Sequence, residues 1–179
     1  PRPARPAGPG GRAPRPGAGH ALSTALSAAL STALPAALVL GAHTCAVTHV
    51  SRHEAHGGST AAPTAALATA AALAAAVLRT NRLPSRGHRA PAPGPRGTGR
   101  TLALTAFTGA YLGTAARPLL HAALNPSPPL TRRSVGGGIR AMIPLQAALA
   151  TRAGAPLTGL AVMGLGPLAR SLARKVSPT

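Results

Sequence analysis

The chain has 179 residues, a formal net charge of +18 and a single acidic residue, Glu54. Aromatic residues make up 1% and charged residues 11% of the sequence, which disfavours an ordinary water-soluble core. The one cysteine excludes an intramolecular disulfide. Little charge combined with much Ala, Gly, Ser and Thr is instead typical of packed membrane helices, in which small residues let the backbones approach.

The first segment, residues 1–19, consists mainly of Pro, Gly, Ala and Arg. Proline removes amide donors and glycine costs backbone entropy, so this composition predicts a disordered arm. The arginines of the arm have two interpretations, contact with lipid headgroups or simple solvation.

Two long stretches, Ala21–Val50 and Ala55–Leu78, contain no Lys, Arg, Asp or Glu. A helix needs roughly 20 apolar residues to cross a bilayer, so each stretch predicts a membrane-spanning helix. In the first stretch leucine recurs every fourth residue from Leu22 to Leu34, which marks one face of a helix, and Pro35 is expected to kink it. The second stretch is mostly alanine and is expected to insert best as part of a bundle.

A proline- and arginine-rich loop is predicted over Arg79–Arg100, followed by a third span over Thr101–Leu124. Arg117 interrupts that span, and it is expected either to reach the membrane surface or to face the bundle interior. After a predicted turn at Asn125–Arg133, the last apolar segments are Gly136–Thr151 and Ala155–Ala169. These elements predict an all-α, integral membrane helical bundle of four or five transmembrane helices over residues 20–170, with a basic tail at residues 171–179.

The segment His49–Thr60 joins the two charge-free stretches and holds the most distinctive polar residues. Within it, Arg52 and Glu54 precede a glycine pair and the pair Ser59-Thr60, which opens the next apolar stretch. This layout resembles the second acidic motif of the UbiA superfamily of intramembrane prenyltransferases. The segments Asn125–Arg133, Val135–Gln146 and Pro167–Thr179 resemble the C-terminal portion of a bacterial branch of that superfamily.

The resemblance implies a multi-pass protein of a bacterial plasma membrane that transfers an isoprenyl group from an isoprenyl diphosphate to a lipophilic acceptor. It implies that Glu54 is the catalytic residue and a Mg²⁺ ligand, and that Mg²⁺ neutralises the diphosphate. Arginine makes bidentate contacts with phosphate, which suits it to the substrate. The substrate-binding residues implied in this way are Arg52, Ser51, Ser59, Arg132, Arg133 and Arg140.

The chain departs from the family pattern in its acidic residues. It contains no aspartate, Ser51 stands where an acid is expected, and the first acidic motif is missing. One carboxylate is too few for two Mg²⁺ ions, so we expect either the C-terminal part of a longer enzyme or an inactive form. The start at Pro1, without a signal peptide, fits that expectation. The positive-inside rule and the resemblance predict opposite orientations in the membrane.

Several alternatives stay open at this level. The chain could be a small non-enzymatic membrane protein whose basic loops contact anionic lipid, or the product of a GC-rich gene read in a wrong frame. Glu54 could simply pair with Arg52. Cys45, His49 and His53 share one helix face and could hold a soft metal. Nucleic acid is not an expected partner, because the arginines are dispersed and no aromatic stacking platform is present.

Overall fold

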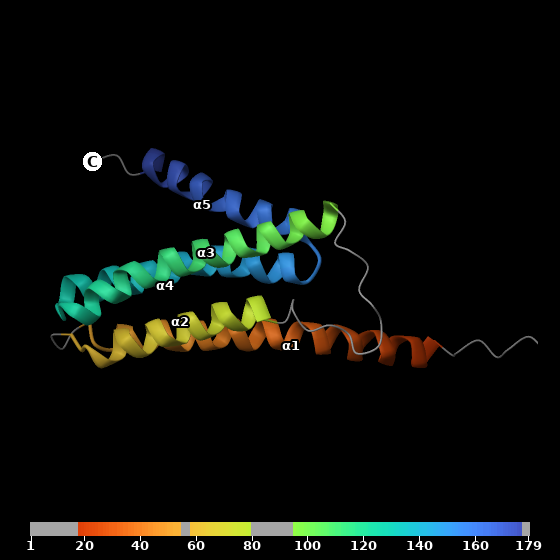
Figure 1. Ribbon diagram of the computed structural model, residues 1–179, viewed down its shortest axis with the longest axis horizontal. Helices are drawn as coiled ribbons and strands as arrows, with labels where there is room; N and C mark the ends of the chain where they lie inside the picture. Colours follow the sequence, from red (N-terminus) through yellow and green to blue (C-terminus); the bar gives the residue numbers. More distant parts are fainter. Residues whose placement is uncertain (1–17, 55–57, 80–94, 177–179) are drawn as a thin grey trace, which may run out of the picture. The chain divides into compact units, whose positions relative to one another are not determined.

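The computed structural model describes residues 18–54, 58–79 and 95–176, and all regular structure within these ranges is helical. The all-α fold class is therefore confirmed. The predicted arm up to residue 17, most of the predicted loop (80–94) and the last three residues of the tail lie outside the described ranges. The described helices are α1 (Ala18–Ser51), α2 (Ala61–Arg79), α3 (Pro95–Leu124), α4 (Pro128–Arg152) and α5 (Pro156–Val176), as Figure 1 shows.

The chain divides into two compact units, Pro1–Leu34 and Pro35–Thr179. In the first unit, α1 carries the predicted leucine stripe, and Leu26, Leu30 and Leu34 are 62%, 59% and 61% exposed. The second unit contains the rest of α1 and the other helices, and it holds all the features described below.

The core of the second unit lies where α3 and α4 pack along each other (Figure 1). Helix α2 packs against α3, and α5 packs against α4. The buried positions of α4 recur in steps of three and four, as expected for a helix with one packed face. These buried positions include Thr131, Ser134, Gly138, Ala141, Leu145 and Ala148.

Glycine on α4 lets the neighbouring helices approach closely. A Cβ built on Gly137 would lie 2.5 Å from Cγ of Pro118 on α3, and one built on Gly138 would lie 2.5 Å from Cγ2 of Val47 on α1. Small residues at helix contacts are the usual means of close packing between membrane helices.

Several helix boundaries differ from the sequence-based prediction, including those of α3, α4 and α5. Helix α3 begins at Pro95 rather than Thr101, and α5 continues to Val176, into the predicted tail. The predicted turn at Asn125–Arg133 is largely wrong, because α4 already begins at Pro128. Proline fits the first positions of a helix, where its missing amide would have no partner in any case, so the prolines here open α4 instead of forming a loop. Arg132 and Arg133 consequently lie on a helix.

Two of the described helices are long and apolar enough to cross a membrane, over Ala33–Ser51 and Ala61–Arg79. Only 17% of the first apolar segment and 33% of the second is buried inside the protein. An apolar helix that forms the core of a soluble protein buries most of its surface, so this exposure favours lipid as the surroundings. Arg117, the interrupting arginine of the third predicted span, is exposed on α3 and does not face the interior.

Candidate functional site

The α1–α2 connection and the α3–α4 turn meet at one end of the second unit. Gly58 has a φ of +88°, a backbone conformation that other residues rarely adopt. A Cβ at Gly58 would lie 3.1 Å from the carbonyl carbon of Pro126 and 3.1 Å from the amide nitrogen of Ser127. Gly58 of the segment His49–Thr60 therefore lies against Pro126 and Ser127 of the segment Asn125–Arg133.

Glu54 lies in the turn that ends α1 and is half-buried. Its amide donates a hydrogen bond to the carbonyl of Ser51 at 3.1 Å, which holds Glu54 within one turn of the helix end. Arg52 is exposed. Within the described ranges, no ion pair joins Glu54 to Arg52 or to another base.

The hydroxyl groups of Ser51 and Ser59 both serve the local backbone. Ser51 donates from Oγ to the carbonyl of Thr48 at 2.8 Å. Oγ of Ser59 accepts the amide of Ala62 at 3.3 Å, which is the bond made by a residue that caps the N-terminus of a helix. The structure thus gives Ser59 a capping role in addition to the substrate contact that the resemblance implies.

An apolar groove of about 320 Å³ lies between α1 and α4. On α1 it extends from His43 to Ser51, a distance of about 12 Å along the helix. On α4 its wall is formed by Val135, Gly138, Ile139 and Met142. The groove therefore reaches the end of α1 within one turn of Glu54.

The three arginines of α4 do not form one cluster. Arg132 lies one turn before Val135, so it shares the helix face that lines the groove. Arg133 lies on another face and is exposed. Arg140 lines a separate cavity between α3, α4 and α5. Of the sequence-predicted residues, the structure thus brings Ser51, Arg52, Glu54, Ser59 and Arg132 to one end of the bundle.

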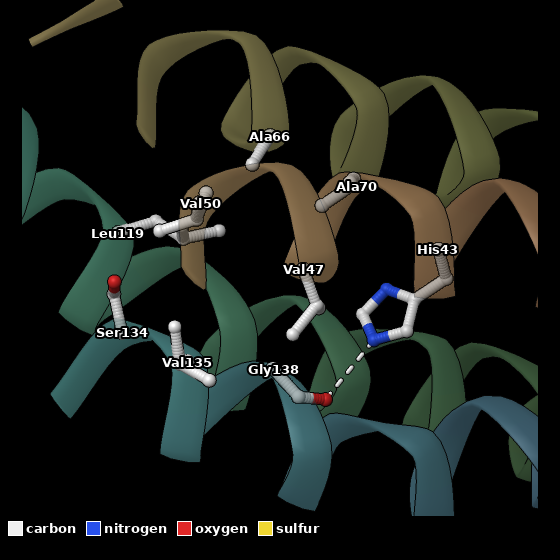
Figure 2. Close-up of a pocket in the computed structure, with 10 residues that line it drawn as sticks. His43, Val47, Val50, Ala66, Ala70, Leu119, Ser134, Val135 and Gly138 are labelled. Atoms are coloured by element: carbon white, nitrogen blue, oxygen red, sulfur yellow. Dashed lines mark hydrogen bonds between the residues drawn. The ribbon is translucent and has the colours of Figure 1, made fainter. Parts of the chain in front are cut away.

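A buried hydrogen-bonded group, which the sequence analysis did not single out, joins three helices beside the groove. Nε2 of His43 on α1 donates to the carbonyl of Gly138 on α4 at 3.0 Å, as Figure 2 shows. Since that nitrogen carries the proton, Nδ1 accepts the hydroxyl of Tyr111 on α3 at 3.1 Å. His43 is 3% exposed and Tyr111 is fully buried. One signal was available, because Tyr111 is the only tyrosine in the chain and His43 lies within a charge-free stretch.

The soft-metal alternative is not supported. The rings of His49 and His53 meet edge to face with centroids 5.4 Å apart, and Nδ1 of His53 donates to the carbonyl of His49 at 3.1 Å. Cys45 is exposed. Among the residues for which the structure gives positions, no group of three His, Cys, Asp or Glu side chains is arranged to hold a metal ion.

The scarcity of acidic side chains limits how many Mg²⁺ ions this chain can hold. Glu54 supplies the only carboxylate side chain of the whole sequence, so the residues do not fit a two-metal centre built by this chain alone. Mg²⁺ commonly binds one or two carboxylates together with substrate phosphates and several waters. Glu54 alone therefore suits one ligand position on an ion that arrives with a diphosphate.

Comparison of the chain with protein-family models, with curated proteins and with solved structures gives no match. The likeness to the UbiA superfamily therefore rests on the quoted residues.

Proposed function

We propose that this protein is a multi-pass membrane protein that binds an isoprenyl diphosphate, with the isoprenyl chain in the α1–α4 groove and the diphosphate at the end of α1. The observation that carries the proposal is the groove itself, whose exposed surface is mostly apolar although four of its five α1 residues are polar. It reaches Ser51, which lies within one turn of Glu54. Ligand sites are typically apolar cavities with a few polar groups at fixed places.

The proposed division of labour follows from the chemistry of each group. Arg132 and Arg52 stabilise the diphosphate by charge-assisted hydrogen bonds. Glu54 provides one oxygen ligand to the Mg²⁺ that accompanies it. When bound, that ion would neutralise charge on the leaving diphosphate.

Transfer of the isoprenyl group to a lipophilic acceptor is part of the proposal, as the family resemblance implies. A single carboxylate supplies at most one ligand position of a two-metal Mg²⁺ centre. The remaining acidic ligands would therefore come from polypeptide outside these 179 residues. The proposed location of the protein is the plasma membrane of a bacterium.

The binding test uses the full chain in nanodiscs of neutral lipid, with farnesyl diphosphate and Mg²⁺ as the probe. We expect Glu54→Gln and Arg132→Gln each to weaken binding about tenfold, as the loss of a contact between charged groups predicts. The matched control is Arg133→Gln, which removes a neighbouring exposed arginine on another face of α4 and should change binding less than twofold. Equal weakening by the two arginine variants would contradict the groove as the binding site.

A second function is favoured by a separate observation. Arg52, Arg117, Arg132 and Arg133 are exposed, and the chain has one acidic residue to pair with them. A non-enzymatic membrane protein whose basic segments contact anionic lipid would show these features. It predicts membrane insertion with no measurable farnesyl diphosphate binding, so the same experiment separates the two functions.

A further inference from the structure

A second cavity, of about 540 Å³, lies between α3, α4 and α5. Its walls include Ala110, Ile143 and Met163, and among the lining residues whose side chains the structure describes Arg140 is the charged one. Its volume is within the range of small-molecule sites, which is about 300–1,000 Å³. None of its lining residues also lines the α1–α4 groove.

Arg140 occupies the middle of α4 (Pro128–Arg152), about 18 Å from either end at ~1.5 Å of rise per residue. Its guanidinium lies near Gly136, with Nη2 3.8 Å from the position of a built Cβ. The only carboxylate side chain of the sequence, Glu54, lies in the turn after α1. Arg140 is exposed where it lines the cavity, and no acidic side chain of the described residues pairs with it, so its charge is available to an anionic group from outside the chain.

Two prolines of the cavity wall add hydrogen-bond acceptors to it. Pro144 on α4 and Pro167 on α5 lie inside their helices and line the cavity. Because proline has no amide proton, the carbonyl four residues earlier loses its helical donor. Those carbonyls belong to Arg140 and Met163, which both line the same cavity.

A third proline gives a useful contrast. Pro118 on α3 likewise leaves the carbonyl of Thr114, another lining residue, without its helical donor. That carbonyl lies 3.2 Å from the position of a Cβ on Gly137, so it faces the backbone of α4. The carbonyls of Arg140 and Met163 are therefore the two that lack a helical donor, belong to lining residues and have no such contact with a neighbouring backbone among the described distances.

We infer that this cavity binds the headgroup of an anionic phospholipid that carries free hydroxyl groups. The phosphate pairs with Arg140, and the hydroxyls donate to the carbonyls of Arg140 and Met163. A metal cation would also suit two carbonyls, but the guanidinium repels it.

The surface of α5 supports a lipid as the occupant. Leucines on this helix, which also contributes to the cavity wall, are exposed, and acyl chains would cover them where water would not. These leucines are Leu157, Leu160, Leu165 and Leu168, which are 79%, 56%, 57% and 54% exposed.

The experiment measures lipid binding by native mass spectrometry on the full chain in neutral detergent. The probes are phosphatidylglycerol, phosphatidylmethanol, which has the same charge and no hydroxyl, and phosphatidylcholine. We expect phosphatidylglycerol to bind about fivefold more tightly than phosphatidylmethanol, the value of one hydrogen bond. Arg140→Gln should weaken the binding of both anionic lipids about tenfold, while Arg133→Gln should change it less than twofold.

Pro144→Ala tests the carbonyl acceptor separately from the charge. Alanine restores the amide that bonds the carbonyl of Arg140, so the preference for phosphatidylglycerol over phosphatidylmethanol should fall while the binding of phosphatidylmethanol is kept. Helicity measured by circular dichroism verifies that each variant is folded.

Three results would overturn the inference. One is equal weakening by Arg140→Gln and Arg133→Gln, which indicates diffuse surface charge. Another is an unchanged headgroup preference in Pro144→Ala. The last is full competition by free glycerol 1-phosphate, which would assign the cavity to soluble phosphate esters. Because cavity and groove share no lining residue, this inference and the proposed isoprenyl diphosphate site fail independently.

Discussion

At the scale of single residues, His43 has the strongest structural role, because it joins α1 to both α3 and α4. Both of its ring nitrogens are satisfied, one by the carbonyl of Gly138 and the other by the hydroxyl of Tyr111. Among the described residues, buried side-chain polar atoms all have a hydrogen-bond partner. When a buried polar group loses its hydrogen-bond partner, the stability of the folded protein falls by the desolvation free energy of that group.

Tyr111→Phe is therefore expected to lower the free energy of unfolding by about 1–3 kcal/mol, because it leaves Nδ1 of His43 buried without a donor. Thr108→Val is the matched control. It removes a buried hydroxyl from the same helix, but that hydroxyl bonds only to the carbonyl of Leu104 in its own helix. Thermal unfolding in detergent measures the stability of both variants. An equal loss of stability in the two would contradict a stabilising hydrogen bond between His43 and Tyr111.

Ser59 offers a second test at this scale, because its oxygen caps α2. Ser59→Ala is expected to cost about 1 kcal/mol of stability, and Ser59→Asp to restore it, because aspartate is an equally good cap. Farnesyl diphosphate binding separates this role from a substrate contact. If Ser59 contacts the diphosphate, the added negative charge of Ser59→Asp abolishes binding in a protein of normal stability.

At the scale of helices, α5 is placed by one glycine. A Cβ on Gly159 would lie 2.6 Å from Oγ1 of Thr151, 2.8 Å from the carbonyl oxygen of Ala147 and 3.1 Å from Cε2 of Phe107. A backbone carbonyl cannot move aside as a flexible side chain does. Any side chain at position 159 therefore pushes α5 away from α4 and α3.

Gly159→Ala is expected to destabilise the protein by about 1–3 kcal/mol through overpacking. Gly164→Ala, on the same helix, meets nothing within 4 Å and is expected to stabilise it by about 0.5–1 kcal/mol, since alanine is the better helix former. Thermal unfolding of the two variants, measured in parallel, is expected to give shifts of the unfolding temperature that are opposite in sign. Shifts of the same sign would contradict the packing of α5.

The helices themselves were predictable, and their contacts were not. Charge-free apolar stretches identify α1 and α2 with few assumptions, because little else than a helix accommodates so many consecutive alanines and leucines. The start of α4 was missed, since proline opens helices as readily as it forms turns. The bond between His43 and Tyr111 joins residues 68 positions apart, a separation that no local pattern encodes.

The candidate site was predictable only in part. The sequence identified Glu54 because it is the single acid, and the structure places Ser51, Arg132 and Gly58 at the same end of the bundle. The separation of Arg132, Arg133 and Arg140 depends on how α4 is turned toward its neighbours. A list of basic residues carries no information about that rotation.

At the scale of the whole molecule, the protein combines exposed leucines on its helices with several arginines near the helix ends, while Arg117 and Arg140 are exposed within α3 and α4. Leu38, Leu102, Leu120 and Leu124 are 66%, 66%, 45% and 75% exposed. Arg100 donates to the carbonyl of Arg152 at 2.7 Å and so joins the start of α3 to the end of α4. A cation at a helix C-terminus is favourable, and basic residues at helix ends are typical of membrane bundles. Lipid surroundings therefore account for the exposed leucines and for the basic helix ends.

The native Cys45 tests this account most directly, because it is the only cysteine of the sequence, is exposed and lies inside the apolar segment Ala33–Ser51. In sealed vesicles, we expect a sulfonated, membrane-impermeant maleimide to leave Cys45 unlabelled, although the vesicles are prepared with protein in both orientations. An apolar pyrene maleimide should label it, and denaturation in SDS should open it to both reagents. Rapid labelling by the sulfonated reagent in intact vesicles would show that α1 lies in water and would contradict the account.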